Sequence, residues 1–145
     1  MNCHLFDFHD GRRRPIAGLP DDEYGEPDPD AKKVKLDSYF TDANTCVYEY
    51  DFGDSWEHDV GIKGIVERPE NFGRMLLGGA RAFPPEDCGG IPGYEECVRV
   101  ANGGKDPEKL REWLDGWDPE KFNFKKIERL FYQAKLVLRG HYEEA

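Results

Sequence analysis

The sequence predicts an α+β fold, in which an antiparallel or mixed sheet packs against C-terminal helices. Two observations predict it. Residues 45–67 alternate between apolar and polar side chains, as in a β-hairpin, and in the last third of the chain apolar residues recur at helical spacing. A length of 145 residues is typical of one domain with a core of its own. We therefore expect residues 1–145 to form a single domain around a central hairpin.

The N-terminal third predicts short strands joined by loops. Residues 4–8 (HLFDF) have the pattern of a brief strand, and residues 11–15 (GRRRP) that of a turn. Residues 18–30 hold six carboxylates, three prolines and two glycines, so we expect a loop there. A second brief strand is predicted at 33–36 and a turn at 38–40.

The hairpin prediction can be taken as far as a register. The two alternating runs flank Gly53-Asp54-Ser55, which we assign to the turn. One register collects the aromatic and aliphatic side chains on a single face, and it sets position 52 opposite 56, 50 opposite 58 and 48 opposite 60. We expect that face to be buried and the acidic face to be solvated.

The other face of this hairpin would carry four acids. The register sets Asp51 opposite Glu57 and Glu49 opposite Asp59. Like charges directly across a ladder are destabilising, unless water screens them or a cation lies between them. A solvated face is the favoured interpretation. The alternative is that these four residues bind a divalent ion or a partner rich in Lys and Arg.

Residues 68–93 are rich in glycine and proline, and three helices are predicted after them, at about 93–102, 107–115 and 119–139. Asp106-Pro107-Glu108 has the order expected at a helix start, with a capping residue, a proline and an acid. Five basic residues recur at helical spacing in the last helix: Lys121, Lys125, Arg129, Lys135 and Arg139. A solvated helix surface is the favoured interpretation, and contact with phosphate is the alternative.

Composition narrows the class of function. The formal net charge is -10, which argues against direct binding of nucleic acid. No apolar run is long enough to span a bilayer, and no signal sequence is apparent, so a cytoplasmic location is expected. Cys3, Cys46, Cys88 and Cys97 have no CxxC spacing, and we expect reduced, packed thiols.

His58 is the first candidate for acid–base chemistry. Asp54 lies in the adjoining turn, and Tyr50 is predicted opposite His58. A histidine on an apolar face is more often a packed ring, and the chain contains neither a serine-nucleophile motif nor HExxH. Tyr50 and Trp56, with Arg81 further along the chain, are the candidate binding residues.

The PPEDCGG segment, residues 84–90, is the second candidate. Its two glycines allow the backbone N–H groups to form an anion-binding concavity. Glu86 and Asp87 are candidate ligands or acid–base groups, and Cys88 is a candidate reactive thiol. The favoured alternative is a turn that fits this loop against the hairpin. Arg81 could pair with one of the two acids or bind an anion.

Three segments carry a resemblance to a known family: YEYDFGDSWEHDV (48–60), GGARAFPPEDCGGIPGY (78–94) and, more weakly, WDPEKFNF (117–124). They resemble the plasmid pRiA4b ORF-3-like family over about residues 4–138. The resemblance implies a sheet packed against C-terminal helices. It also implies a setting on plasmids and insertion elements, where members are sometimes labelled resolvase-like. It brings no established catalytic activity.

The chain departs from that family in three respects. By the resemblance, strand and helix segments are expected before the HLFDF stretch and do not occur in the 145 residues, and Phe6 stands where relatives have a second histidine. Leu76 and Phe83 stand where relatives often have cysteines, so a cysteine-based metal or redox site is not expected. A sheet without its usual cover would expose backbone and apolar surface, so we expect self-association or a protein partner.

Three functions follow from the sequence. A non-enzymatic interaction or binding module of a mobile element is favoured, and enzyme activity stays uncertain. The alternative is a metal-assisted hydrolase that uses carboxylates of the hairpin and the PPEDCGG loop together with His58. A DNA-site accessory factor is the second alternative. No cofactor is predicted, although a divalent cation is compatible with the acids, and the sequence names neither ligand nor oligomeric state.

Overall fold

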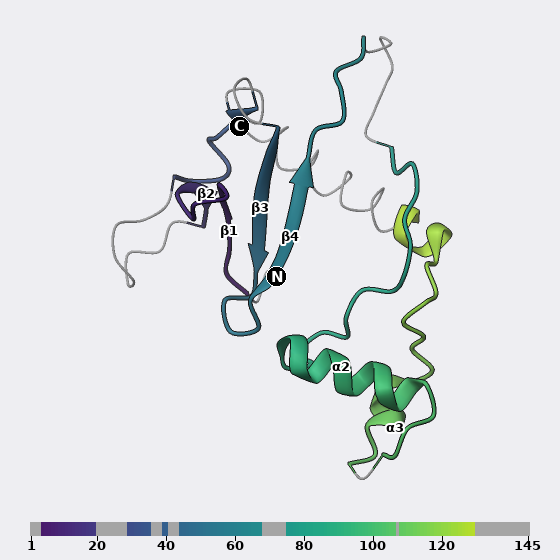
Figure 1. The fold of residues 1–145 in the computed structure, drawn as a ribbon. Helices are drawn as coiled ribbons and strands as arrows, with labels where there is room; N and C mark the ends of the chain where they lie inside the picture. Colours follow the sequence, from purple (N-terminus) through teal and green to yellow (C-terminus); the bar gives the residue numbers. More distant parts are fainter. Residues whose placement is uncertain are drawn as a thin grey trace, which may run out of the picture. The chain divides into compact units, whose positions relative to one another are not determined.

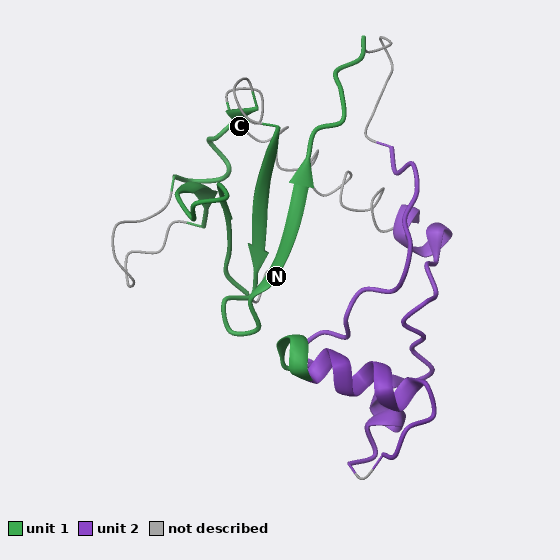
Figure 2. Ribbon diagram, viewed as in Figure 1, with its two compact units in different colours: residues 1–67, 89–92 green, residues 68–88, 93–145 purple. Residues whose placement is uncertain are grey.

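The computed structural model describes residues 4–19, 29–35, 39–40, 44–67, 75–106 and 108–129. An antiparallel sheet comes from the first half of the chain and helices from the second, so the predicted α+β class is confirmed (Figure 1). Contacts divide the chain into two compact units, residues 1–67 with 89–92 and residues 68–88 with 93–145 (Figure 2). No helix of the described part is both long and apolar enough to cross a membrane.

The first unit contains a four-stranded sheet in the order β2-β1-β3-β4. The strands are β1 (Phe6–His9), β2 (Pro15–Gly18), β3 (Thr45–Tyr50) and β4 (Trp56–Gly61), and all three pairings are antiparallel. The hairpin predicted within 45–67 is β3–β4. The sequence did not predict β2, because four residues that begin with proline and end with glycine carry almost no strand signal.

A side chain at the end of β1 shapes the β1–β2 turn. The Asp10 carboxylate accepts the backbone N–H groups of Arg12 (2.8 Å) and Arg14 (3.0 Å) and the Arg14 Nε–H (2.6 Å). Between them, Arg13 takes a φ of 58°. This is the turn predicted from GRRRP, and Asp10 is what allows three consecutive arginines to occupy it.

The predicted register of the hairpin is wrong by two residues. The structure pairs Tyr50 with Trp56, Tyr48 with His58 and Cys46 with Val60. The strand ends two residues earlier than expected because Asp51 takes a φ of 57°, and its carboxylate accepts the Gly53 N–H at 3.0 Å. The loop therefore spans residues 51–55. A shift of two residues moves the partners but leaves every side chain on its predicted face.

The sheet thus has two chemically different faces, because paired residues point to the same side. The aromatic face carries Phe6, Phe8, Cys46, Tyr48, Tyr50, Trp56, His58 and Val60. The polar face carries Asp7, His9, Val47, Glu49, Glu57 and Asp59.

The exposure predicted for these faces is right only in part, since Glu57 and Asp59 are exposed and Cys46 is buried as expected. Glu49, on the polar face, is only 8% exposed, whereas His58, on the aromatic face, is exposed. Two groups from outside the paired strands explain the burial of Glu49. Arg13 from the β1–β2 turn and Ser55 from the hairpin loop both hydrogen-bond its carboxylate.

The second unit is built around α2 (Gly90–Ala101), which begins three residues before the predicted helix. Cys97 and Val100 of α2 are buried with Leu114, and Cys88 and Trp117 pack against them. Cys46, Cys88 and Cys97 are free thiols, as their spacing predicted, and burial raises the pKa of the Cys97 thiol. Cys3 lies outside the described residues.

Two later helices begin after their predicted starts. α3 spans Leu110–Leu114 with Lys109 at its N-cap, and the Asp106 carboxylate accepts the N–H groups of Leu110 (2.6 Å) and Arg111 (3.0 Å). The last helix is present at residues 124–129, after Asn123, whose side chain accepts the Lys126 N–H at 3.0 Å. The predicted continuation to 139, with Lys135 and Arg139, lies outside the described residues.

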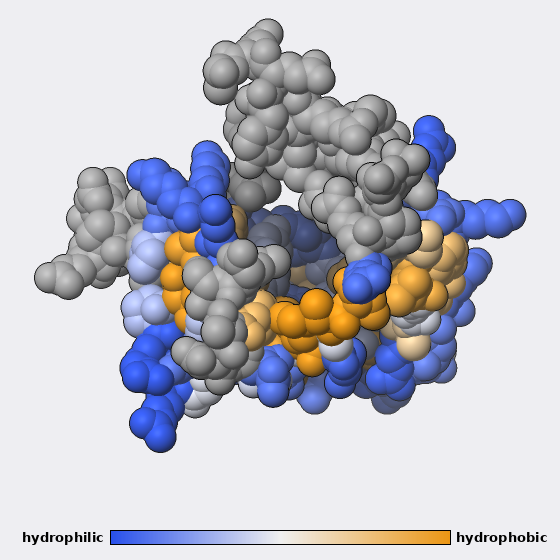
Figure 3. All heavy atoms as spheres, turned by 90° about the horizontal axis from the view of Figure 1, so that it is seen from above, coloured by the Kyte–Doolittle hydropathy of each residue, from blue (hydrophilic) through white to orange (hydrophobic). Residues whose placement is uncertain are grey.

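The remaining loop predictions can be compared with the structure only where their residues are described. Residues 33–35 form a turn and coil rather than the predicted strand, while residue 36 is not described. Only the two ends of the 18–30 loop are described, and they meet in a bridge between Gly18 and Asp30. In the predicted turn at 38–40, position 38 is likewise outside the described part. Large apolar side chains reach the surface, Ile65 and Leu77 foremost, and Figure 3 shows apolar surface on the face that it depicts.

Gly93 offers a test of the junction that leads into α2. A Cβ at this position would overlap the backbone carbonyl of Cys88, so we expect Gly93→Ala to lower the free energy of unfolding by about 1–3 kcal/mol. Helix propensity alone would predict a gain of about 1 kcal/mol. Gly78→Ala is the control, because a Cβ there meets no atom within 4 Å. Urea unfolding measures both variants, and an unchanged or raised stability of Gly93→Ala would contradict the close approach.

Candidate functional site

His58 does not lie among carboxylates. It is on the aromatic face, where its ring lies 5.5 Å from that of Tyr48, the residue actually paired with it. Its Nδ1 is 3.2 Å from the Tyr48 carbonyl and 3.1 Å from the Trp56 carbonyl, so an Nδ1–H donates to the backbone. Glu49 and Glu57 point to the opposite side of the sheet. The predicted combination of His58 with hairpin acids is therefore not formed.

Asp54 connects the hairpin loop to the end of the PPEDCGG segment. Its Oδ2 accepts the Gly89 N–H at 3.2 Å, and its backbone carbonyl lies close to Gly90, which takes a φ of 65°. A Cβ at position 90 would come within 3.0 Å of that carbonyl oxygen. The last two residues of the segment therefore contact the hairpin loop, as the favoured interpretation expected of the segment.

The other candidates of that segment divide into packed and exposed groups. Cys88 is half-buried and packs against Cys97 and Val100, so it belongs to the core of the second unit. Glu86 and Asp87 are exposed, and Asp87 takes a φ of 55°.

The four acids of the predicted metal site do not lie together. Glu49 and Glu57 are directly opposite each other and share Arg13, whose Nη1 donates to Glu49 Oε2 at 3.2 Å and whose Nη2 donates to Glu57 Oε1. Asp59 is opposite Val47, and Asp51 is in the loop, where its Oδ2 lies 3.1 Å from His4 Nδ1. The expected Asp51–Glu57 and Glu49–Asp59 pairs are wrong, because the strands pair two residues away from the predicted register.

Two residues that the sequence analysis did not single out join Glu49. Asp7 is directly opposite it on β1, and His9 follows on the same face. One ligand atom from each of the three residues lies within 4.8 Å of the others. The alternation of Phe6, Asp7, Phe8 and His9 could have revealed this polar side of β1. Its partner strand could not be identified from the sequence.

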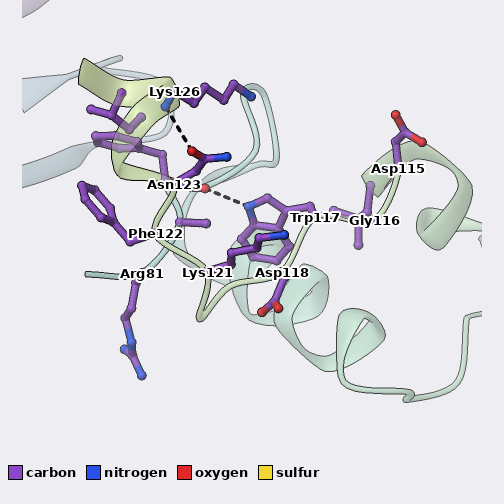
Figure 4. Close-up of a pocket in the computed structure, with 13 residues that line it drawn as sticks. Arg81, Asp115, Gly116, Trp117, Asp118, Lys121, Phe122, Asn123 and Lys126 are labelled. Atoms are coloured by element: carbon purple, nitrogen blue, oxygen red, sulfur yellow. Dashed lines mark hydrogen bonds between the residues drawn. The ribbon is translucent and has the colours of Figure 1, made fainter. Parts of the chain in front are cut away.

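A cavity of about 460 Å³ lies in the second unit (Figure 4). Its apolar lining includes Phe83, Trp117 and Phe122, and its cations include Lys121 and Lys126. The indole N–H of Trp117 donates to the Phe83 carbonyl at 3.0 Å, which fixes the ring in the wall. Of the predicted basic stripe, Lys121 lines the cavity, whereas Lys126 was not part of that prediction. Phe83 could not be placed beside them from the sequence, because it comes from a distant segment.

Arg81 also lines this cavity, but its charge is matched. Its guanidinium lies 3.0 Å from a carboxylate oxygen of Glu120, and Figure 4 shows the side chain pointing away from Trp117. The partner proposed from the sequence was Glu86 or Asp87, and the observed ion pair is with Glu120. Tyr50 and Trp56, the other predicted binding residues, face each other across the β3–β4 pair and are half-buried.

Comparison with known proteins assigns the family. The model of the plasmid pRiA4b ORF-3-like proteins matches residues 1–126. The chain belongs to this family. The resemblance found in the two hairpin and loop motifs is thereby confirmed.

Two further proteins are similar in sequence to this pRiA4b ORF-3-like chain. The uncharacterized protein y4hQ of Sinorhizobium fredii (strain NBRC 101917 / NGR234) is 36% identical, and the match covers 88% of this chain and 68% of that protein. The crystal structure of the protein of unknown function MM3350 from Methanosarcina mazei Go1 is similar, with a TM-score of 0.66 and 35% identity over 83% of this chain and 68% of that one. Neither name states an activity.

The stability of the protein is predicted to depend on pH through Asp10. This residue shapes the turn from which Arg13 reaches the acids of the polar face. Hydrogen bonds, above all from the Arg14 backbone N–H, lower the pKa of Asp10 from 3.8 to about 2. A lowered pKa stabilises the folded state above pH 3.8, and this contribution is lost as the pH falls toward 2. Asp10→Asn should therefore be less stable than the parent at neutral pH, with a difference that narrows below about pH 4.

Urea midpoints of both proteins from pH 7 down to pH 3 measure that difference. Asp115→Asn is the control, since it removes an exposed carboxylate from the other unit. A gap between Asp10→Asn and its parent that stays constant with pH would contradict an ionised Asp10 in the turn.

Proposed function

We propose that this pRiA4b ORF-3-like protein is a non-enzymatic binding module associated with plasmids or other mobile elements, and that the cavity of its second unit holds the ligand. The observation that carries the proposal is the combination, in one cavity, of aromatic side chains, of which Trp117 is held by a hydrogen bond, with two lysines. Neither Lys121 nor Lys126 forms an ion pair with any residue that the structure describes. The family description, which refers to a plasmid, supports the genetic setting.

The lining indicates the chemistry of the ligand. Trp117 and Phe122 offer apolar ring surface, which favours a planar or aromatic body. Asp115 and Asp118 also line the cavity, but the Asp118 carboxylate accepts the Glu120 N–H at 3.0 Å. The lining therefore holds two lysines and two aspartates, and a ligand with an anionic group is favoured where it contacts the lysines, for which the described residues offer no ion-pair partner.

The geometry supports the two alternative functions less well. His58 and the hairpin carboxylates lie on opposite faces of the sheet, so the hydrolase drawn from the sequence lacks its acid–base arrangement. A DNA accessory factor would need a broad basic surface, and the net charge is -10.

An aromatic sulfonate tests the cavity directly. We expect 8-anilinonaphthalene-1-sulfonate to bind at one site per chain, with its fluorescence enhanced by the apolar wall. The double variant Lys121→Gln/Lys126→Gln should weaken this binding about tenfold, or roughly 1.4 kcal/mol, because two charge contacts are lost. Fluorescence titration measures both constants.

The matched control is Lys105→Gln/Lys125→Gln, which removes the same charge from exposed positions outside the lining. It should bind the dye as tightly as the parent. Equal weakening in both double variants would mean that general surface charge attracts the dye, and no weakening in either would mean that it binds elsewhere. Both outcomes would contradict the proposed cavity.

Self-association and a cytoplasmic location belong to the same proposal. In the described sheet β4 is an edge strand, and an exposed edge is a ready surface for a second chain. Light scattering over a concentration series should show a dimer or larger species. A monomer throughout would contradict self-association and leave the ligand-binding proposal to the dye experiment.

A further inference from the structure

The polar face of the sheet places three metal-binding side chains together. Asp7 and His9 are two residues apart on β1, and Glu49 is paired directly with Asp7 on β3. His9 is 4% exposed and Glu49 8%. The site lies wholly in the unit made of residues 1–67 and 89–92, so it is independent of the cavity proposed above.

The protons of His9 can be assigned from its surroundings. Nδ1 is 3.0 Å from the Asp10 carbonyl oxygen, which can only accept, so Nδ1 carries a proton. In the neutral ring Nε2 is then a bare lone pair. That nitrogen is buried, has no hydrogen-bond partner among the described residues, and lies 3.6 Å from Glu49 Oε2, another acceptor.

A buried acceptor facing a carboxylate is costly unless something positive lies between them. The ring nitrogen that is left free by an Nδ1–H···O=C hydrogen bond is also the usual metal ligand of histidine. A zinc ion with bonds of about 2.1 Å holds neighbouring ligands roughly 3.4 Å apart, close to the observed separation of Nε2 and Oε2.

Glu49 is held in position by groups that leave room for such a bond. Its Oε1 accepts the Ser55 hydroxyl at 2.6 Å, and its Oε2 accepts the Arg13 Nη1–H at 3.2 Å while facing His9. Hydrogen bonds of this kind orient ligands around metal ions. The Arg13 side chain is 65% exposed, so it can move away from Oε2 and still pair with Glu57.

The charge of this face also suits a divalent ion. Asp7, Glu49 and Glu57 bring three carboxylates to this face, and Arg13 brings one guanidinium, which pairs with Glu49 and Glu57. One imidazole and two carboxylates favour a transition metal such as Zn²⁺ or Mn²⁺. Mg²⁺ and Ca²⁺ prefer oxygen ligands alone.

We propose that Asp7, His9 and Glu49 bind one divalent transition-metal ion, with His9 Nε2 and one oxygen of each carboxylate as ligands. The ion joins β1 to β3 across their pairing. Three ligands leave further coordination positions for water or a ligand group.

Co²⁺ and Zn²⁺, each added alone to the chelator-treated full chain, test the proposal. We expect one ion per chain by calorimetry, a visible Co²⁺ absorption without the band of a cobalt thiolate, and a higher melting temperature with Zn²⁺. His9→Gln should weaken binding at least about tenfold, and Asp7→Asn should weaken it as well.

Two control variants locate the ion. His58→Gln removes an imidazole from the opposite face of the same sheet, and His4→Gln removes the imidazole next to Asp51, so both should bind the metal like the parent. Circular dichroism of every variant without metal confirms folding. Absence of binding by both ions would overturn the proposal. So would unchanged affinity in folded His9→Gln, or a loss confined to His4→Gln.

Discussion

The pairing of β3 with both of its neighbours determines the chemistry of the first unit. β3 lies between β1 and β4, so each of its last four residues, 47–50, is paired with one residue on either side. Tyr48 thereby meets Phe8 and His58, and Glu49 meets Asp7 and Glu57. A slip of one residue would mix rings with acids and abolish both surfaces. The core of the second unit, around Val100, forms without this sheet.

Features that follow from the periodicity of side chains could be predicted from the sequence. Features that depend on residues distant in the sequence could not. Alternation in 45–61 predicts the hairpin and the composition of its faces, because the side-chain period of a strand survives any even shift. The left-handed backbone of Asp51, which shortens β3, leaves no such pattern. The burial of Glu49 also escapes prediction, since Arg13 reaches it from a turn 36 residues away. The family resemblance, carried by two motifs, is confirmed by the match over residues 1–126.

The candidate site residues show the same contrast between what residue type suggests and what strand pairing reveals. Asp54 and Cys88, which their residue types mark as reactive, hold a loop and fill a core. Asp7 and His9 acquire their significance only when β1 is placed beside β3. The proposed activities therefore rest on two independent units, an aromatic and basic cavity in one and a metal-binding face in the other. The family supplies no activity that would choose between them.

Cross-strand nuclear Overhauser contacts in the full chain test the pairing of β3 most directly. The structure predicts contacts of Tyr48 with Phe8 on one side and with His58 on the other, and of Glu49 with Asp7 and Glu57. Contacts that instead pair Tyr48 with Val60 would contradict the register. They would also remove the basis for the two faces described above.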